Sequence, residues 1–142
     1  MINKRIVWAG LAAGVLCHFL QGSGAYFIFD RFYFENPDIV RDPGLIVGIY
    51  YLLINMVLGV VIAHLAYYFH GVWEDTSWKI GLRAGLILWA GSSPIWIAKR
   101  QILLKLSNWL LLEIIFDLIV FGLVGILAGF LVGIIIRREA KE

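Results

Sequence analysis

The sequence has little charge. Only 15% of its 142 residues are Asp, Glu, Lys or Arg, whereas 61% are hydrophobic, and the mean hydropathy is +0.86. A soluble domain of this length needs a polar surface that this composition does not supply. The net charge is +2, so the chain also lacks the basic excess of a nucleic-acid-binding protein. These shortages predict a protein whose main surroundings are the lipid bilayer.

Cysteine and catalytic motifs are scarce as well. Cys17 is the only cysteine, which excludes an internal disulfide, and its apolar neighbours predict a small buried packing residue. The sequence has no CxxC or HExxH metal motif, no glycine-rich phosphate loop and no GxSxG nucleophile motif. It therefore indicates no metal site and identifies no cofactor. An enzyme is not excluded, but nothing in the sequence favours one.

Long hydrophobic runs, in contrast, are plentiful. A bilayer core of roughly 30 Å needs about 20 apolar residues in a helix. Four stretches meet this need: residues 6–29, 45–69, 80–98 and 109–136. The first stretch stays apolar beyond Ser23 and Ala25, so we expect a retained span and not a cleaved signal sequence. Because a backbone in lipid must satisfy its own hydrogen bonds, we predict an all-α integral membrane protein, one domain with four transmembrane helices in an up-down bundle.

Capping residues and aromatic side chains mark the ends of these spans. N-cap residues precede the last three spans: Asp42 before Pro43, Thr76 or Ser77, and Ser107 or Asn108. Tyrosine and tryptophan gather near the span ends, as they do at membrane interfaces. One predicted belt comprises Trp8, Tyr67, Tyr68, Trp73 and Trp78, and the other comprises Phe32, Tyr33, Tyr50, Tyr51, Trp96 and Trp109.

The basic residues divide unequally between the two sides of the predicted bundle. With both termini on one side, that side holds seven: Lys4, Arg5, Lys79, Arg83, Arg137, Arg138 and Lys141. The opposite side holds five: Arg31, Arg41, Lys99, Arg100 and Lys105. The positive-inside rule then predicts cytoplasmic termini.

Glycines recur along the spans at spacings of three and four residues, which place them on one face of a helix. They are Gly10 and Gly14 in the first span, Gly81 and Gly85 in the third, and Gly122, Gly125, Gly129 and Gly133 in the fourth. Small residues let helix backbones approach closely in lipid. We expect these glycines to pack the helices of one chain together. A face for dimerisation or for a larger partner is the alternative.

A faint internal repeat accompanies the glycines. Residues 9–11 (Ala-Gly-Leu) recur as residues 84–86, and residues 56–62 resemble residues 130–136, at offsets of 75 and 74. One interpretation is a duplicated helical hairpin, whose two copies would be related by a pseudo-twofold axis along the membrane normal. The other is chance recurrence of short apolar strings.

Polar side chains within the spans are costly in lipid, so they are candidates for a functional site. At a rise of roughly 1.5 Å per residue, six lie between the midplane and about 9 Å toward the outer side: His18, Gln21, Asn55, Ser92, Ser93 and Asp117. Glu113 lies about 6 Å above Asp117 on the same face. One interpretation is a polar pocket in the outer half of the membrane, in which His18 and Asp117 exchange a proton. The other is a buried hydrogen-bond network that fixes helix register.

Two further residues bear on that layer. Pro94 can kink the third span and free a carbonyl to line a cavity. A haem held between His18 and His64 is excluded by depth, because His64 falls roughly 10 Å on the inner side of the midplane and axial ligands of one haem share a depth.

The whole plan, four glycine-rich spans with Ala-Gly-Leu in the first and third, resembles that of small bacterial inner-membrane proteins. The resemblance implies that location but no activity, and the positive-inside rule adds the expectation that both termini are cytoplasmic. We expect a non-enzymatic accessory subunit or partner-binding module, in a homo-oligomer or a larger membrane complex. A small transporter or a bundle that binds a ligand or a proton is the alternative, and a lipid- or quinone-modifying enzyme using His18 and Asp117 comes third. The aromatic, charged loop of residues 30–44 fits an interfacial anchor or a docking patch.

Overall fold

The computed structural model describes residues 3–27, 44–104 and 110–141, and in these residues the chain forms four α-helices. They are α1 (Lys4–Phe27), α3 (Gly44–His70), α4 (Ser77–Leu104) and α5 (Leu110–Glu139). Each helix coincides with one of the four predicted apolar stretches over the described residues, so the all-helical prediction is confirmed. The predicted first loop and the predicted caps at Asp42 and at Ser107 or Asn108 lie outside the described residues.

Three of the four helices are long and apolar enough to cross a membrane. The qualifying segments are Lys4–Gly24 in α1, Gly48–His70 in α3 and Leu111–Glu139 in α5. In the remaining helix, α4, the apolar run is interrupted by Arg83, by two adjacent serines and by Pro94. The helix nevertheless continues on both sides of Pro94. The chain is thus a helical bundle with the character of a membrane protein.

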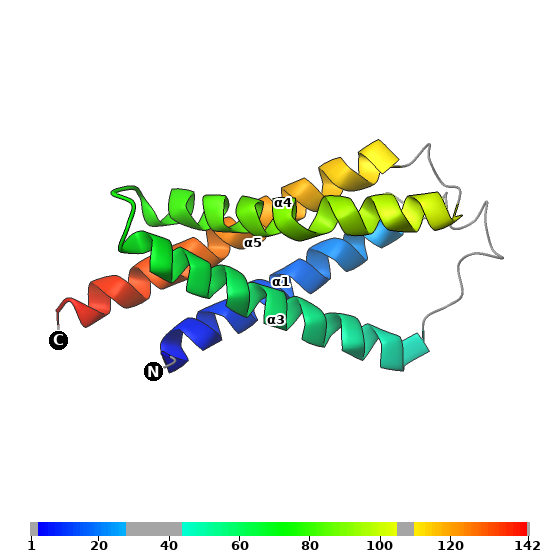
Figure 1. Ribbon diagram of the computed structural model, residues 1–142. Coiled ribbons are helices and arrows are strands. Elements are labelled where there is room, and N and C mark those ends of the chain that lie inside the picture. The colour runs from blue at the N-terminus through cyan, green and yellow to red at the C-terminus, as the bar shows by residue number, and fades with distance from the viewer. Residues whose placement is uncertain (1–2, 28–43, 105–109, 142) are drawn as a thin grey trace.

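Successive helices run in opposite directions along the long axis of the molecule (Figure 1). The start of α1, the end of α5 and the connection between α3 and α4 therefore lie at the same end of the bundle. The largest interfaces join α1 to α3 and α4 to α5, while α5 also contacts α1 and α3. The bundle thus consists of two closely packed pairs, α1 with α3 and α4 with α5, while the consecutive helices α3 and α4 share a much smaller interface.

Glycines set the distance between α1 and α3. A Cβ atom placed on Gly59 of α3 would overlap the backbone of Gly10 and Gly14 in α1. A Cβ atom placed on Gly10 would in turn overlap the backbone of Val60. The two helix backbones are therefore in direct contact, at a separation that larger residues would not permit.

Direct backbone contact at glycines also joins α4 to α5. Gly81 of α4 faces Gly125 and Gly129 of α5, and a Cβ atom on any of the three would overlap backbone atoms of the other helix. Gly85 lies against Gly125 and the carbonyl of Phe121. Close backbone contact therefore extends along more than one turn of this pair.

The other two glycines of the α5 stripe lie against side chains and not against backbone. Gly133 faces the side chain of Ser77, and a Cβ atom on Gly122 would lie 3.4 Å from Cδ1 of Leu82, an ordinary van der Waals distance. Backbone contact within this stripe is therefore made at its centre.

The two helix pairs do not use equivalent positions of the predicted repeat. Gly10 meets Gly59, whereas Gly85, the counterpart of Gly10, meets Gly125. Gly125 lies about two turns before Gly133, which is the counterpart of Gly59. The two hairpins are similar in their pairing of helices but differ in register.

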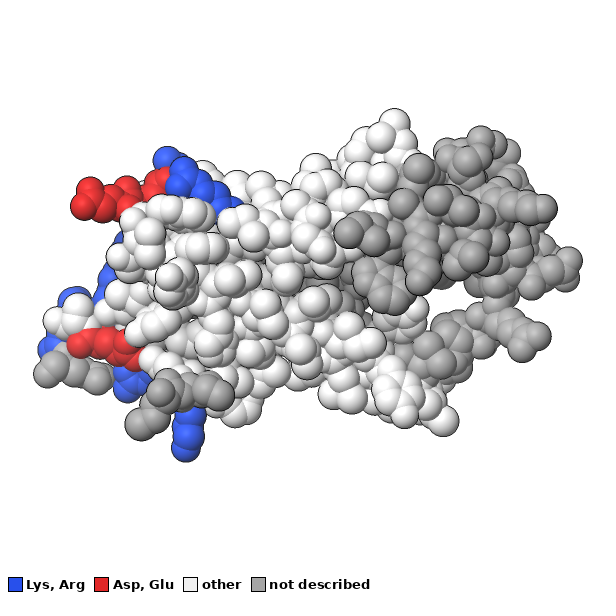
Figure 2. All heavy atoms as spheres, in the orientation of Figure 1, with Lys and Arg blue, Asp and Glu red and all other residues white. Residues whose placement is uncertain are grey.

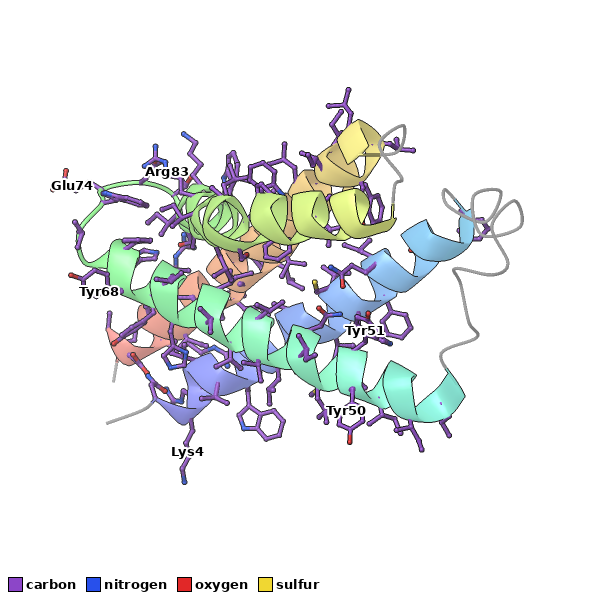
Figure 3. All side chains as sticks on the ribbon, turned by 45° about the vertical axis from the view of Figure 1, so that its right-hand side comes forward. Lys4, Tyr50, Tyr51, Tyr68, Glu74 and Arg83 are labelled. Carbon is purple, nitrogen blue, oxygen red and sulfur yellow. The ribbon has the colours of Figure 1, made fainter. Side chains whose placement is uncertain are left out.

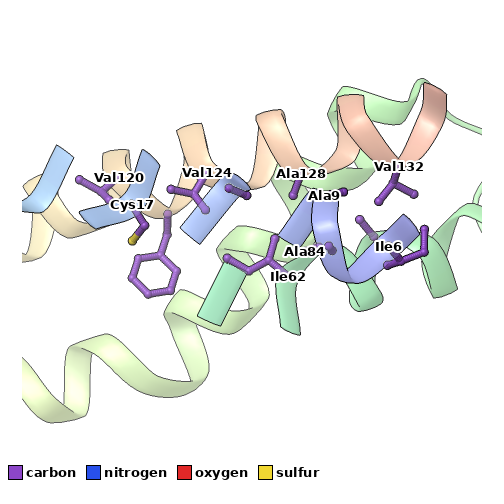
Figure 4. Close-up of a cluster of buried hydrophobic side chains, with 13 residues drawn as sticks. Ile6, Ala9, Cys17, Ile62, Ala84, Val120, Val124, Ala128 and Val132 are labelled. Carbon is purple, nitrogen blue, oxygen red and sulfur yellow. The ribbon is translucent and has the colours of Figure 1, made fainter. Parts of the chain in front are cut away.

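The buried core contains mostly small and β-branched side chains, which suits helices that approach closely. Alanine is its commonest residue, and Phe121 is its only aromatic member among the described residues (Figure 4). The cluster comprises Ile6, Ala9, Ala13 and Cys17 of α1, Ile62, Ala63 and Ala66 of α3, Ala84 of α4, and Val120, Phe121, Val124, Ala128 and Val132 of α5.

Charged and aromatic side chains lie toward the ends of the bundle. On the face shown in Figure 2, the described Lys, Arg, Asp and Glu side chains gather at the end where α1 begins and α5 ends, and the middle is uncharged. Tyr68 lies near this end, and Tyr50 and Tyr51 lie toward the other (Figure 3); all three are exposed. An uncharged middle between two sets of interfacial aromatics is the distribution expected of a bilayer-spanning protein.

The corner between α3 and α4 is ordered by the carboxylate of Asp75. It accepts a hydrogen bond from the amide of Thr76 at 2.8 Å and forms ion pairs with Lys79 at 3.5 Å and Arg83 at 3.0 Å. The Thr76 hydrogen bond, aided by the two cations, lowers the pKa of Asp75 below its ordinary value of 3.8. Thr76 is the N-cap of α4, because its carbonyl accepts the first helical hydrogen bond, from the amide of Ile80 at 3.1 Å.

Candidate functional site

Hydrogen bonds join polar side chains of α1, α3 and α5 inside the bundle. Nδ2 of Asn55 donates to Oε1 of Gln21 at 2.9 Å, and Nε2 of Gln21 donates to Oδ1 of Asp117 at 3.4 Å. Sγ of Cys17, a weak donor, lies 3.7 Å from Oδ1 of Asn55. We call Cys17, Gln21, Asn55 and Asp117 the interior polar chain.

Helix packing explains why these side chains meet. Cys17 and Gln21 are one turn apart on the inward face of α1. Gly14, one turn earlier on α1, lies against the backbone of Asn55, so the side chain of Asn55 projects from a backbone that is already close to α1. Asn55 is only 3% exposed, so its side chain needs partners within the protein.

The approach of α5 to α1 brings Asp117 to the same place. A Cβ atom on Gly24 of α1 would overlap the ring of Phe116, the residue before Asp117. The absence of a side chain at Gly24 therefore lets α5 come close enough for Gln21 to reach the carboxylate.

The predicted partner of Asp117 was His18, and the structure gives Asp117 a different one. Gln21 bonds the carboxylate, while the ring of His18 makes an edge contact with Phe19, with 6.4 Å between centroids. His18 is rotated by about 100° around α1 from the inward-facing Cys17. In the described part of the chain, no hydrogen bond joins His18 to Asp117.

The other predicted site residues are Ser92, Ser93 and Glu113. Oγ of Ser92 donates to the carbonyl of Leu88, one turn back in its own helix, at 2.7 Å. Ser93 is buried, and Glu113 is partly buried one turn before Asp117. The described hydrogen bond of Ser92 thus stays within α4.

Binding of a cofactor or metal could also involve three further side chains, those of His64, His70 and Trp89. Nδ1 of His64 bonds the carbonyl of Val60, and Nε2 of His70 bonds Oγ of Ser77, both at 2.8 Å. Within the described residues, no group of three or more His, Cys, Asp or Glu side chains is placed to hold a metal ion. Nε1 of Trp89 is buried and has no hydrogen-bond partner among the described atoms.

Sequence reasoning placed Cys17 in the core but missed its polar contact. The available signal was its spacing of four residues from Gln21, which puts both side chains on one helix face. Two grooves on the described structure, one beside Leu16 and Leu127 and one beside Arg5 and Arg138, are lined by other residues, largely apolar, and not by the interior polar chain. The polar groups therefore bond to one another and do not line either groove.

Comparison of the chain with known protein families, curated proteins and solved structures finds no match.

Proposed function

We propose that all four helices cross the membrane, with the start of α1 and the end of α5 on the cytoplasmic side of a bacterial inner membrane. The support for α4 comes from its packing. Gly81 and Gly85 of α4 are in backbone contact with α5, which has the highest hydropathy of the spans. A helix held this closely along a transmembrane helix shares its depth in the bilayer.

We further propose that the protein is a non-enzymatic, partner-binding subunit of a membrane assembly. The observation that carries this proposal is the outward face of α4 formed by Ile87, Ala90, Gly91 and Pro94. These residues are three and four positions apart, so they share one face. Ile87 is 48% exposed, Ala90 and Gly91 are exposed, and a Cβ atom on Gly91 would have nothing within 4 Å.

This face differs from an ordinary lipid-facing surface in its backbone. Pro94 has no N–H group, so the carbonyl of Ala90, four residues earlier, lacks its usual donor in the helix. A carbonyl without a donor is costly in hydrocarbon, where lipid chains offer none. A transmembrane helix of another subunit, packed on the small residues Ala90 and Gly91, can supply both the close contact and the donor.

Leucine substitutions at two open glycines test this proposal. Gly91 of α4 and Gly48 of α3 both have open space around them, so each accepts a leucine within the single chain. We expect the wild type and Gly48→Leu to purify in mild detergent as an assembly, and Gly91→Leu to purify as a monomer. Native mass measurement gives the subunit number and the mass of any partner.

The measured mass distinguishes two possible compositions of the assembly. A multiple of the chain mass identifies a homo-oligomer, and an additional mass identifies a different subunit. A wild-type protein that is strictly monomeric and without a partner would contradict the proposal, as would equal effects of the two leucines.

A second function is favoured by the interior polar chain. Asp117 brings an ionisable group into the bundle, and Trp89 offers a buried donor without a described partner. Intramembrane carboxyl groups are common in proton and ligand pathways. The second candidate is therefore a small transporter or a ligand-binding bundle centred on Asp117, Gln21 and Asn55.

The variant Asp117→Asn separates this candidate from a structural role. The asparagine retains an acceptor for Gln21 but removes the titratable group. In proteoliposomes, a transporter would lose proton-coupled flux while its folded yield stayed at the wild-type level. A fall in thermal stability with no change in flux would assign Asp117 to structure alone.

A further inference from the structure

A groove runs between the first half of α1 and the last part of α5. Its volume is about 480 Å³. The apolar walls are formed by Trp8, Ala9, Ala12, Leu131, Ile134 and Ile135. Arg5 and Arg138 complete the lining. Because α1 and α5 run in opposite directions, both arginines lie at the same end of the groove, the charged end of the bundle (Figure 2).

The described residues at this end of the groove carry a net positive charge. Among the described residues at the start of α1 and the end of α5, the acid is Glu139 and the bases are Lys4, Arg5, Arg137, Arg138 and Lys141. Nδ2 of Asn3 donates to Oε1 of Glu139 at 2.8 Å. This hydrogen bond ties the beginning of α1 to the end of α5 and keeps the two arginine-bearing turns together.

We infer that this groove is a binding site for an anionic phospholipid. The guanidinium groups of Arg5 and Arg138 would bind the phosphate, because arginine presents several donors in a planar arrangement that matches phosphate oxygens. An acyl chain would lie along the apolar walls toward the bilayer centre. Trp8, which is 72% exposed, would lie at the level of the headgroup.

A second groove of the described structure provides an internal comparison. Its volume is about 450 Å³, and it is lined only by apolar and aromatic side chains, among them Leu16, Leu127 and Phe130. An acyl chain could fill it, but no cation is among its lining residues; Nζ of Lys79 lies 5.7 Å from the ring centroid of Trp78, which lines it. A wall that itself contains cations is therefore a property of the groove with the two arginines, as in other basic pockets between transmembrane helices.

Native mass spectrometry of the full chain, in a neutral detergent, tests this inference. Phosphatidylglycerol and phosphatidylcholine with identical acyl chains are the two probes. We expect the wild type to retain phosphatidylglycerol in preference to phosphatidylcholine. Loss of one basic residue near an anionic lipid weakens binding by about fivefold, so Arg5→Gln with Arg138→Gln should weaken it by about twenty-five-fold.

A matched variant separates a site from general attraction between charges. Lys4→Gln with Arg137→Gln removes the same charge from the same two helix ends, but neither residue lines the groove. We expect this control to keep the lipid preference of the wild type. Circular dichroism of each variant verifies its helix content, and Arg138→Gln alone, with an expected fivefold effect, serves if the double variant does not fold.

The apolar part of the groove has its own test. Ala12 lines the groove and is exposed, so Ala12→Phe would fill the groove and reduce retention of phosphatidylglycerol with all charges intact. The inference is overturned by equal retention of the two lipids, by equal effects of the two double variants, or by no effect of Ala12→Phe. Full competition by free glycerol phosphate would also overturn it, because it would assign the arginines to a soluble phosphate compound.

Discussion

Asn55 is the residue through which the interior polar chain connects two helices. Its amide nitrogen donates to Gln21 and its oxygen lies near the thiol of Cys17. Side-chain hydrogen bonds in membrane proteins average only about 0.6 kcal/mol, because the unfolded state in the membrane also finds partners. The interior polar chain therefore fixes the relative rotation of α1 and α3 more than it stabilises the fold.

A double-mutant cycle measures this contribution. We expect Gln21→Leu and Asn55→Leu to show a coupling free energy of about 0.6 kcal/mol in reversible unfolding, because both remove the same hydrogen bond. Gln21→Leu combined with Ser92→Ala should be additive, since Ser92 bonds its own helix. A Gln21–Asn55 coupling of zero would show that the 2.9 Å contact contributes nothing to stability.

At this scale, the sequence predicted membership of the polar layer better than it predicted partners. The depths of Gln21, Asn55 and Asp117 follow from counting residues along each span, and these three do meet. The choice of Gln21 over His18 depends on how α1 is rotated about its axis. That rotation is decided by contacts such as Gly14 with Asn55, which one sequence does not reveal.

At the scale of helices, the glycine contacts restrict most strongly which residue each position can hold. Gly59 of α3 has the backbone of Gly10 and Gly14 where its own Cβ would be, whereas Gly48 on the same helix faces open space. We expect Gly59→Ala to lower the free energy of unfolding by about 3 kcal/mol, because backbone cannot move aside as a side chain can.

Gly48→Ala is the matched substitution for this experiment. It adds the same methyl group to the same helix, and we expect it to leave stability unchanged or to raise it by up to about 1 kcal/mol through helix propensity. Thermal and denaturant unfolding in detergent measure both variants. If Gly59→Ala proved as stable as Gly48→Ala, direct backbone contact between α1 and α3 would be ruled out.

The α3–α4 corner makes a prediction about pH. The pKa of Asp75 is lowered in the folded protein, so its carboxylate stabilises the corner fully above the ordinary pKa of 3.8. The contribution is lost as pH falls below 3.8 and through the folded pKa. We therefore expect Asp75→Asn to melt at a lower temperature than the wild type at pH 7, with the difference shrinking toward pH 3. A difference that stayed constant over this range would exclude the carboxylate as its cause.

The helices themselves were the most predictable elements. Apolar runs of this length have few alternatives to a helix in lipid, and α3 and α4 enclose the predicted stretches 45–69 and 80–98. Hydropathy alone did not identify α4 as a span, because the helix contains charged and polar residues. Lys79 and Arg83 pair with Asp75 in the preceding corner, and Ser92 bonds a carbonyl of α4 itself.

At the scale of the whole molecule, the proposed four spans predict the sidedness of two exposed positions. Glu74 follows α3, and Lys141 follows α5. If α4 crosses the membrane, both lie on one side; if it does not, they lie on opposite sides. In a Cys17→Ala background, we expect Glu74→Cys and Lys141→Cys to react with a membrane-impermeant maleimide from the cytoplasmic side. Labelling from opposite sides would leave three spans.

The glycine contacts also bear on how the protein can change shape. Backbones in direct contact leave little freedom within the α1–α3 pair or the α4–α5 pair, so each pair should move as a rigid unit, and displacement should occur where the pairs meet. The Gln21–Asp117 bond crosses that boundary and, at 3.4 Å, is longer than the 2.9 Å Asn55–Gln21 bond within one pair. Spin labels at the open positions Gly22, Gly48 and Gly91, in the Cys17→Ala background, should therefore give a narrower distance distribution for 22–48 than for 22–91. Rocking of one pair against the other would open the Gln21–Asp117 bond first, so the surroundings of this carboxylate would change with the angle between the two halves of the bundle.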